Sequence, residues 1–183
     1  MAHAPHHGRY TKHDSFPEKA VRRIAGRPAY TGSVRLRLAA EYMLDNLFKE
    51  RLDNNDLLSL GEQGTKLLIE TSYYNPPVNM FGLLDRIKTK GYYPVLAHPE
   101  RYGYMTDTDY KTLKEIGTCF QLNLLSLFGV YGKEARKKAE RMLKEGEYEM
   151  AGTDTHSKTN CMTCMENRYS NASDIAEALL RIP

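Results

Sequence analysis

The sequence predicts an α/β fold with parallel strands, and three observations support this prediction. Short β-like runs alternate with stretches of helical periodicity at least five times along the chain. No low-complexity linker interrupts the alternation. At 183 residues, with 41% hydrophobic and 27% charged side chains, the chain is long enough for one domain with a sizeable core. Such alternation is typical of a doubly wound sheet or a (β/α) barrel.

The individual elements are indicated by caps and periodicity. Ser15 and Glu18 form a capping box and Gly26 marks an end, so residues 14–26 are expected to form a helix. Further expected elements follow in chain order. They are a strand at 33–40, a helix at 41–52, a strand at 65–72, a helix at 80–91, a strand at 92–98, a helix at 108–117, a strand at 118–125, a helix at 133–146, a strand at 148–154 and a helix at 171–182.

Charge and hydropathy exclude some classes of protein. The balance of 26 basic and 23 acidic side chains gives +3, too little to indicate nucleic-acid binding. The sequence contains neither a run of about 18 apolar residues nor the apolar segment of a secretory signal. We therefore expect a cytoplasmic protein without membrane insertion.

The three cysteines also suit a reducing compartment, because an odd number cannot form a disulfide framework. Cys161 and Cys164 have the C-x-x-C spacing of a zinc or redox motif. No second cysteine pair accompanies them, so a structural or incidental role is the favoured interpretation.

Polar side chains of metal-ligand type fall at the ends of the expected strands. Because the carboxyl ends of parallel strands meet on one face, these residues are expected to gather in space. Taken singly, each is more readily explained as a polar or helix cap. Together they favour a site, because buried charges are costly unless paired or bound to metal. The residues are Glu41, Glu70, His98, Asn123, Asp154 and His156.

Carboxylates and imidazoles form a nitrogen and oxygen donor set that suits manganese, iron or zinc. Two or more such metals about 3.5–4 Å apart can activate water and clamp a phosphoryl group, so phosphoester hydrolysis is the natural use.

Four more histidines, His3, His6, His7 and His13, lie near the N-terminus. They could form a solvated segment, part of a tag or, for one of them, a metal ligand.

Six strings in the chain carry a resemblance to a known family. The two most specific are "AAEYMLD" within residues 38–45 and "AHPERY" at 97–102. The others are "APHHGRY" at 4–10, "LLIETSY" at 67–73, "FQLNLLSLFGVYG" at 120–132 and "AGTDTH" at 151–156. With these strings in this order, the chain resembles the PHP-type metal-dependent protein-tyrosine phosphatases of bacterial capsule and exopolysaccharide operons.

The resemblance implies a distorted (β/α)7 TIM-like barrel, the PHP fold, with up to three metals at its carboxyl end. The usual metal is manganese, although other divalent ions could serve. The implied metal ligands are His6, Glu41, Glu70, His98, Asp154 and His156. Arg101 would hold the substrate phosphate beside His98, while Glu100 would brace the arginine or the turn.

The implied activity is hydrolysis of phosphotyrosine on a protein of polysaccharide export, with a bacterial tyrosine kinase as the substrate partner. No cysteinyl intermediate is expected, because the chain has no C-x5-R signature. Two alternatives remain. One is a PHP hydrolase acting on histidinol phosphate or nucleic-acid ends, and the other is a degenerate, non-catalytic PHP module.

The N-terminus departs from the family pattern. In the family an H-x-H and an aspartate precede the histidine of the T-P-H motif, whereas only five residues precede His6 here. We therefore expect one PHP-like domain over residues 1–183 that lacks the first βα unit and three ligands. The open barrel edge of such a domain favours pairing with another chain, so a homo-oligomer is a further expectation.

Overall fold

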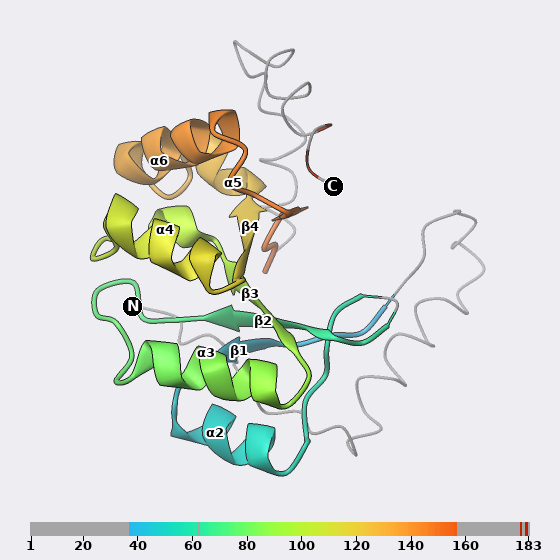
Figure 1. Ribbon diagram of the computed structural model, residues 1–183. Coiled ribbons are helices and arrows are strands. Elements are labelled where there is room, and N and C mark those ends of the chain that lie inside the picture. Colours follow the sequence, from blue (N-terminus) through green and yellow to red (C-terminus); the bar gives the residue numbers. More distant parts are fainter. Residues whose placement is uncertain (1–36, 62, 157–179, 181, 183) are drawn as a thin grey trace, which may run out of the picture. The chain divides into compact units, whose positions relative to one another are not determined.

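The computed structural model describes residues 37–61, 63–156, 180 and 182. Within them, strands and helices alternate as the sequence predicts (Figure 1). The helix expected at 14–26, the ligand His6 and the pair Cys161 and Cys164 lie outside the described residues. Of the helix expected at 171–182, only residues 180 and 182 are described, and neither is helical.

The chain divides into two compact units. The first runs up to Glu70 and includes Pro77–Pro94, and the second comprises Thr71–Pro76 and the chain from Val95 onward. The expectation of a single domain stays a prediction. Within the described residues, every helix is too short or too polar to cross a membrane.

The first unit contains two parallel strands and two helices. Strand β1 (Glu41–Met43) pairs with β2 (Lys66–Glu70), and Met43 lies opposite Glu70. Helix α2 (Asn46–Asp53) follows β1, and helix α3 (Met80–Thr89) follows β2 (Figure 1). Three leucines, one each from α2, β2 and α3, are fully buried in the core, namely Leu52, Leu67 and Leu84.

The first strand lies later in the chain than predicted. Residues 37–40 have no regular structure, and Glu41 is the first residue of β1 rather than the residue after a strand. The predicted helix at 41–52 begins only at Asn46, because the Asp45 carboxylate caps it by accepting the Phe48 N–H at 2.8 Å. The apolar residues of this segment therefore serve two elements, which the helical spacing alone concealed.

The second unit contains the remaining parallel strands. Strand β3 (Tyr93–Ala97), whose first two residues belong to the first unit, pairs with β4 (Cys119–Asn123), and β4 pairs with β5 (Met150–Gly152). Leu96 and Phe120 face each other in register and are fully buried. Truncating a buried leucine of this kind typically costs about 2–5 kcal/mol. The parallel α/β prediction is confirmed, although β5 is shorter than the run 148–154.

Helices of the second unit begin close to their predicted starts. Helix α4 (Asp107–Glu115) opens with a capping box in which Thr106 and Asp109 satisfy each other's backbone N–H groups. Helix α6 (Lys133–Lys144) begins at the predicted residue. The short helices η1 (Pro99–Arg101) and α5 (Leu124–Leu127) were not predicted.

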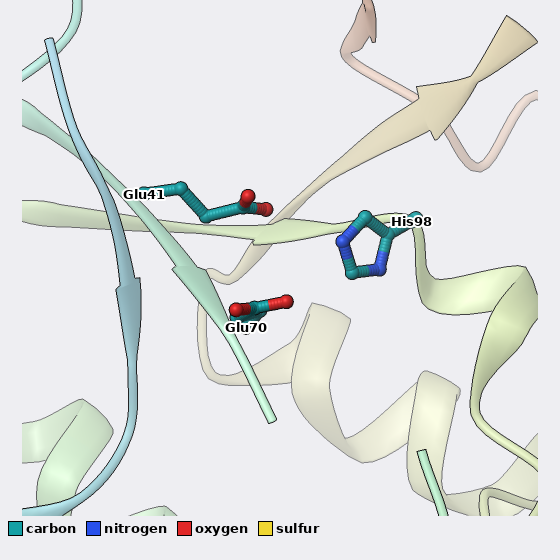
Figure 2. Close-up of side chains that lie close together, drawn as sticks. All are labelled: Glu41, Glu70 and His98. Atoms are coloured by element: carbon teal, nitrogen blue, oxygen red, sulfur yellow. The ribbon is translucent and has the colours of Figure 1, made fainter. Parts of the chain in front are cut away.

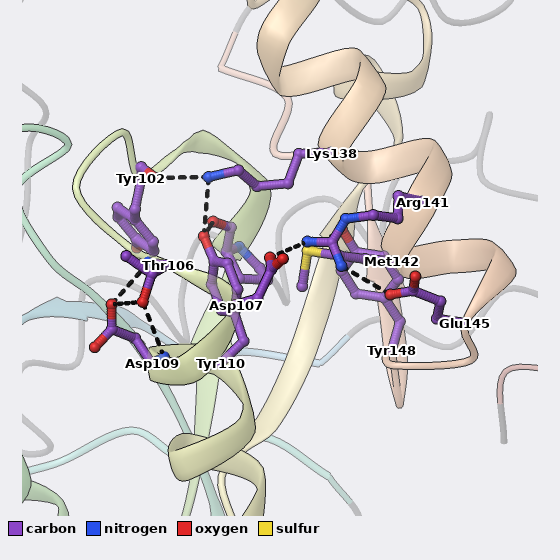
Figure 3. Close-up of polar contacts among 11 residues, drawn as sticks. Tyr102, Thr106, Asp107, Asp109, Tyr110, Lys138, Arg141, Met142, Glu145 and Tyr148 are labelled. Atoms are coloured by element: carbon purple, nitrogen blue, oxygen red, sulfur yellow. Dashed lines mark hydrogen bonds and ion pairs between the residues drawn. The ribbon is translucent and has the colours of Figure 1, made fainter.

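Helix α6 is tied to α4 and to the chain after η1 by polar contacts (Figure 3). Lys138 Nζ donates to the Tyr102 carbonyl at 2.9 Å and to the Tyr110 hydroxyl at 3.2 Å. The Tyr110 hydroxyl in turn donates to the Pro99 carbonyl at 2.8 Å. Arg141 reaches Asp107 of α4 at 2.7 Å. The backbone in and directly after the "HPER" string is thus held at two carbonyl groups, those of Pro99 and Tyr102.

Candidate metal and phosphate site

Three of the predicted ligands come together. Glu41, Glu70 and His98 each offer one ligand atom, and these atoms all lie within 4.8 Å of one another. Figure 2 shows both carboxylates and the imidazole pointing toward a common region. Glu70 and His98 are each 2% exposed, whereas Glu41 is partly exposed. The donor set of carboxylate oxygen and imidazole nitrogen fits a divalent transition metal.

The position of His98 depends on an unusual backbone conformation. Its N–H donates to the Gln121 carbonyl at 2.8 Å, which extends the β3–β4 pairing by one residue. The chain then turns, with His98 in the left-handed region at φ 37° and Pro99 as the first residue of η1. Such a conformation costs a non-glycine residue roughly 1–2 kcal/mol, so strain is stored at a residue with a proposed chemical role.

Arg101 lies three residues beyond His98 and is held on several sides. Its Nη1 donates to Asp154 Oδ2 at 2.9 Å, and both side chains are 15% exposed. Its guanidinium carbon lies 4.4 Å from the ring centroid of Tyr73 and 3.8 Å from that of Tyr131. Cation–π contacts on two rings fix the plane of the guanidinium, whose donors form the rigid fork that matches phosphate oxygens.

Asp154 and His156 form a second pair of predicted ligands. Asp154 Oδ1 lies 2.7 Å from His156 Nε2, and Asp154 Oδ2 accepts from Asn123 Nδ2 at 3.0 Å as well as from Arg101. Asp154 is also in the left-handed region, at φ 45°. The His156 side chain is 66% exposed. The two side chains therefore contact each other, but among the described residues neither belongs to the group of Glu41, Glu70 and His98.

Glu100 is buried and contacts both the last residue of β4 and Tyr148, which precedes β5. Its Oε1 accepts the Asn123 backbone N–H and its Oε2 accepts the Tyr148 hydroxyl, each at 3.1 Å. Burial raises the pKa of the Glu100 carboxyl, and the hydrogen bond from the Asn123 N–H opposes this shift. The contacts agree with the expected bracing role, although they hold the end of β4 rather than Arg101.

Sequence reasoning missed the two tyrosines that flank Arg101. Tyr73 follows β2, and Tyr131 lies between α5 and α6, where no periodic pattern marks a role. Burial raises the pKa of the Tyr131 hydroxyl, and the positive charge of Arg101 opposes that shift. The only available signal was the abundance of tyrosine, 13 residues in all, which does not single out these two.

Comparison with known proteins identifies the family. The sequence pattern of the family described as "Capsular polysaccharide synthesis, CpsB/CapC" matches residues 1–175. The chain belongs to this family. It is similar to the tyrosine-protein phosphatase YwqE of Bacillus subtilis (strain 168), with 30% identity over 125 residues, which are 66% of this chain and 48% of YwqE.

A second relative is CapC of Staphylococcus aureus, with 28% identity over 128 residues, which are 68% of this chain and 49% of CapC. The chain therefore spans about half the length of the curated relatives it matches. Its fold is similar to one described with the crystal structures of YwqE from Bacillus subtilis and CpsB from Streptococcus pneumoniae, "unique metal-dependent tyrosine phosphatases". That match has a TM-score of 0.58 and 25% identity, and covers 78% of this chain and 63% of the other. It confirms the expected fold class.

Proposed function

We propose that the chain hydrolyses phosphotyrosine in a metal-dependent reaction, on a protein of capsular or exopolysaccharide synthesis. The observation that carries this proposal is the group of Glu41, Glu70 and His98, whose ligand atoms lie within 4.8 Å of one another. Membership of the CpsB/CapC family supports the biological setting, and the similarity to the tyrosine-protein phosphatase YwqE supports the reaction.

The proposed metal is Mn²⁺, because the donors are carboxylate oxygens and imidazole nitrogens without sulfur. Glu41, Glu70 and His98 would hold one ion, and Asp154 with His156 would contribute to the same centre or a neighbouring one. His6 is proposed as a further ligand from its motif alone. When bound, the metal supplies Lewis acidity and activates water at neutral pH.

The residues of the chain supply the binding and charge compensation. Arg101 would bind the phosphate through its guanidinium fork and stabilise the negative charge that develops during in-line displacement. Its contacts with Asp154, Tyr73 and Tyr131 hold it in one orientation before substrate arrives. Such preorganisation matters because a donor that must reorient during the reaction contributes less to catalysis.

The proposed substrate is a phosphotyrosine segment of a bacterial tyrosine kinase, and the proposed location is the cytoplasm. The absence of a helix that could span a membrane within the described residues agrees with this location. The weak net charge of +3 gives little basis for nucleic acid as a substrate.

The test measures phosphate release from a phosphotyrosine peptide, histidinol phosphate and single-stranded DNA, with and without Mn²⁺. We expect the peptide to be the best substrate, EDTA to abolish the reaction, and a thiol alkylator to leave it unchanged. His98→Ala should be inactive. Glu50→Gln, which removes an exposed carboxylate from α2, is the matched control and should retain full activity. Loss of activity on alkylation but not on chelation would overturn the proposal.

A further inference from the structure

Asn123 is a buried residue at the end of β4 whose backbone N–H and both side-chain polar atoms have hydrogen-bond partners. Its backbone N–H donates to Glu100 Oε1 at 3.1 Å. Its side-chain oxygen accepts the Leu125 N–H at 2.9 Å, which caps α5, and its side-chain nitrogen donates to Asp154 Oδ2 at 3.0 Å. Because the oxygen must face a donor and the nitrogen an acceptor, the amide has one favourable orientation.

The amide in turn fixes the orientation of the Asp154 carboxylate. Oδ2 receives two donors, Asn123 Nδ2 at 3.0 Å and Arg101 Nη1 at 2.9 Å. Oδ1 is the oxygen beside the imidazole of His156. Rotation of the carboxylate would break both contacts of Oδ2. The two oxygens therefore have different roles. Oδ2 holds the side chain in place, whereas Oδ1 lies beside His156, the other proposed ligand.

The contacts close into a ring. Glu100 binds the backbone of Asn123, the Asn123 side chain binds Asp154, and Asp154 binds Arg101, which follows Glu100 in the chain. The Tyr148 hydroxyl holds the other oxygen of Glu100 at 3.1 Å. Asn123 and Glu100 are each 2% exposed, so water competes little for these hydrogen bonds. A change at Asn123 should therefore reach both Asp154 and Arg101.

We propose that Asn123 is a positioning residue that orients the carboxylate of Asp154, a proposed metal ligand, and, through Asp154 Oδ2, holds Arg101 in place for phosphate. This inference rests on the proposed function, because it takes Asp154 as a metal ligand. Partners of metal ligands in other proteins typically contribute 10- to 100-fold in metal affinity or activity, and Asn123 is expected to act on this scale.

Two substitutions separate positioning from simple helix capping. Asn123→Ser and Asn123→Asp both keep an oxygen that can accept the Leu125 N–H, since serine and aspartate are good caps. Both remove the donor to Asp154, and aspartate places a like charge there. If Asn123 only caps α5, both variants should behave like the wild type. If it positions Asp154, serine should weaken the site and aspartate should weaken it further.

The test combines Mn²⁺ titration calorimetry on the full chain with crystal structures of the metal-free wild type and the Asn123→Ser variant. We expect the Kd for Mn²⁺ to rise about tenfold for serine and toward 100-fold for aspartate. Thermal unfolding of the serine variant should occur at a lower temperature, because the hydrogen bond to Asp154 is lost, and its Asp154 carboxylate should be rotated. Asn46→Asp, which adds a carboxylate at an exposed site, should leave the Kd unchanged.

The structural readout separates this inference from the proposed function. A wild type that binds Mn²⁺ but does not hydrolyse phosphotyrosine would overturn the proposed function and leave the role of Asn123 in metal binding intact. An Asp154 carboxylate in the same place in wild type and Asn123→Ser would overturn the role of Asn123, with or without bound metal. So would a Kd for Mn²⁺ within twofold of the wild-type value in the serine and aspartate variants.

Discussion

The two units present their strand-end carboxylates in different ways. In the first unit, Glu41 and Glu70 come from adjacent strands and offer ligand atoms within 4.8 Å of each other. In the second unit, Asp154 is held by Arg101 and Asn123, with hydrogen bonds of 2.9 and 3.0 Å. Like charges at that separation repel each other, whereas the contacts of Asp154 are attractive.

The difference indicates that the two arrangements contribute differently to activity and to stability. Two neighbouring carboxylates attract a divalent cation, so the pair of Glu41 and Glu70 suits metal binding. Asp154 instead contributes to folding even without metal, because its neighbours compensate its charge. The first arrangement should thus matter mainly to activity, and the second to both activity and stability.

Glu70→Gln should give the largest effect and sharpen this comparison. Losing a proposed ligand should reduce Mn²⁺-dependent kcat/KM by more than about 100-fold, because even residues that only support a ligand often contribute 10- to 100-fold. The free energy of unfolding without metal should fall by less than about 1 kcal/mol, because glutamine keeps the shape and an acceptor oxygen of the glutamate. Phosphate release and urea denaturation in EDTA measure the two quantities.

The comparison would fail if Glu70→Gln strongly destabilised the metal-free protein. Asp154→Asn provides the matched contrast, because it weakens the ion pair with Arg101 and should destabilise the metal-free protein by about 2 kcal/mol. Equal losses of stability in the two variants would show that both carboxylates are structural.

Arg101→Lys should have the second largest effect. Lysine keeps the charge but not the planar fork that fits phosphate and stacks on Tyr73 and Tyr131. We expect kcat/KM for the phosphotyrosine peptide to fall about 100-fold. The affinity for Mn²⁺ should change by less than threefold. A large loss of Mn²⁺ affinity would instead show that Arg101 acts mainly through Asp154.

The sequence was sufficient to predict the α/β alternation. Amphipathic helices repeat their apolar residues about every 3.6 positions, whereas buried strands are short apolar runs. It was less informative at residues 41–46, where one apolar run serves β1 and α2 and only the Asp45 cap separates them. Placing Glu41 and Glu70 close together required parallel pairing of β1 and β2, which alternation implies.

The contacts around Arg101 could not be predicted in the same way. Tyr73 and Tyr131 are 58 positions apart and meet the arginine through loops whose paths have no periodic signature. The left-handed backbone at His98 and Asp154 was equally hidden, because neither residue is glycine. Only Asn123 carried a signal, as an amide at a strand end.

Tyr110→Phe should give a moderate effect on stability alone. The hydroxyl donates to the Pro99 carbonyl and accepts from Lys138 Nζ (Figure 3). Burial raises the pKa of Tyr110, so the hydroxyl remains a donor at neutral pH. Its loss should reduce the free energy of unfolding by about 1 kcal/mol in urea denaturation. Tyr93→Phe, at a side chain that is mostly exposed, should have no measurable effect.

Asp109→Asn should give the smallest effect, with a defined pH dependence. Hydrogen bonds from the backbone and side chain of Thr106 lower the pKa of the Asp109 carboxyl below its usual range. The stabilisation is therefore fully present above about pH 5, and it is lost as the pH falls through the lowered folded-state pKa. Because the side chain is exposed, we expect only about 0.5 kcal/mol at pH 7. Thermal unfolding of wild type and variant between pH 2 and 7 should show the difference shrinking at acid pH.

Glu115→Gln, at the other end of α4, is the control, because a carboxylate there gains nothing from the helix dipole. A difference independent of pH would show that the Asp109 carboxylate does not cap α4 as a charged group.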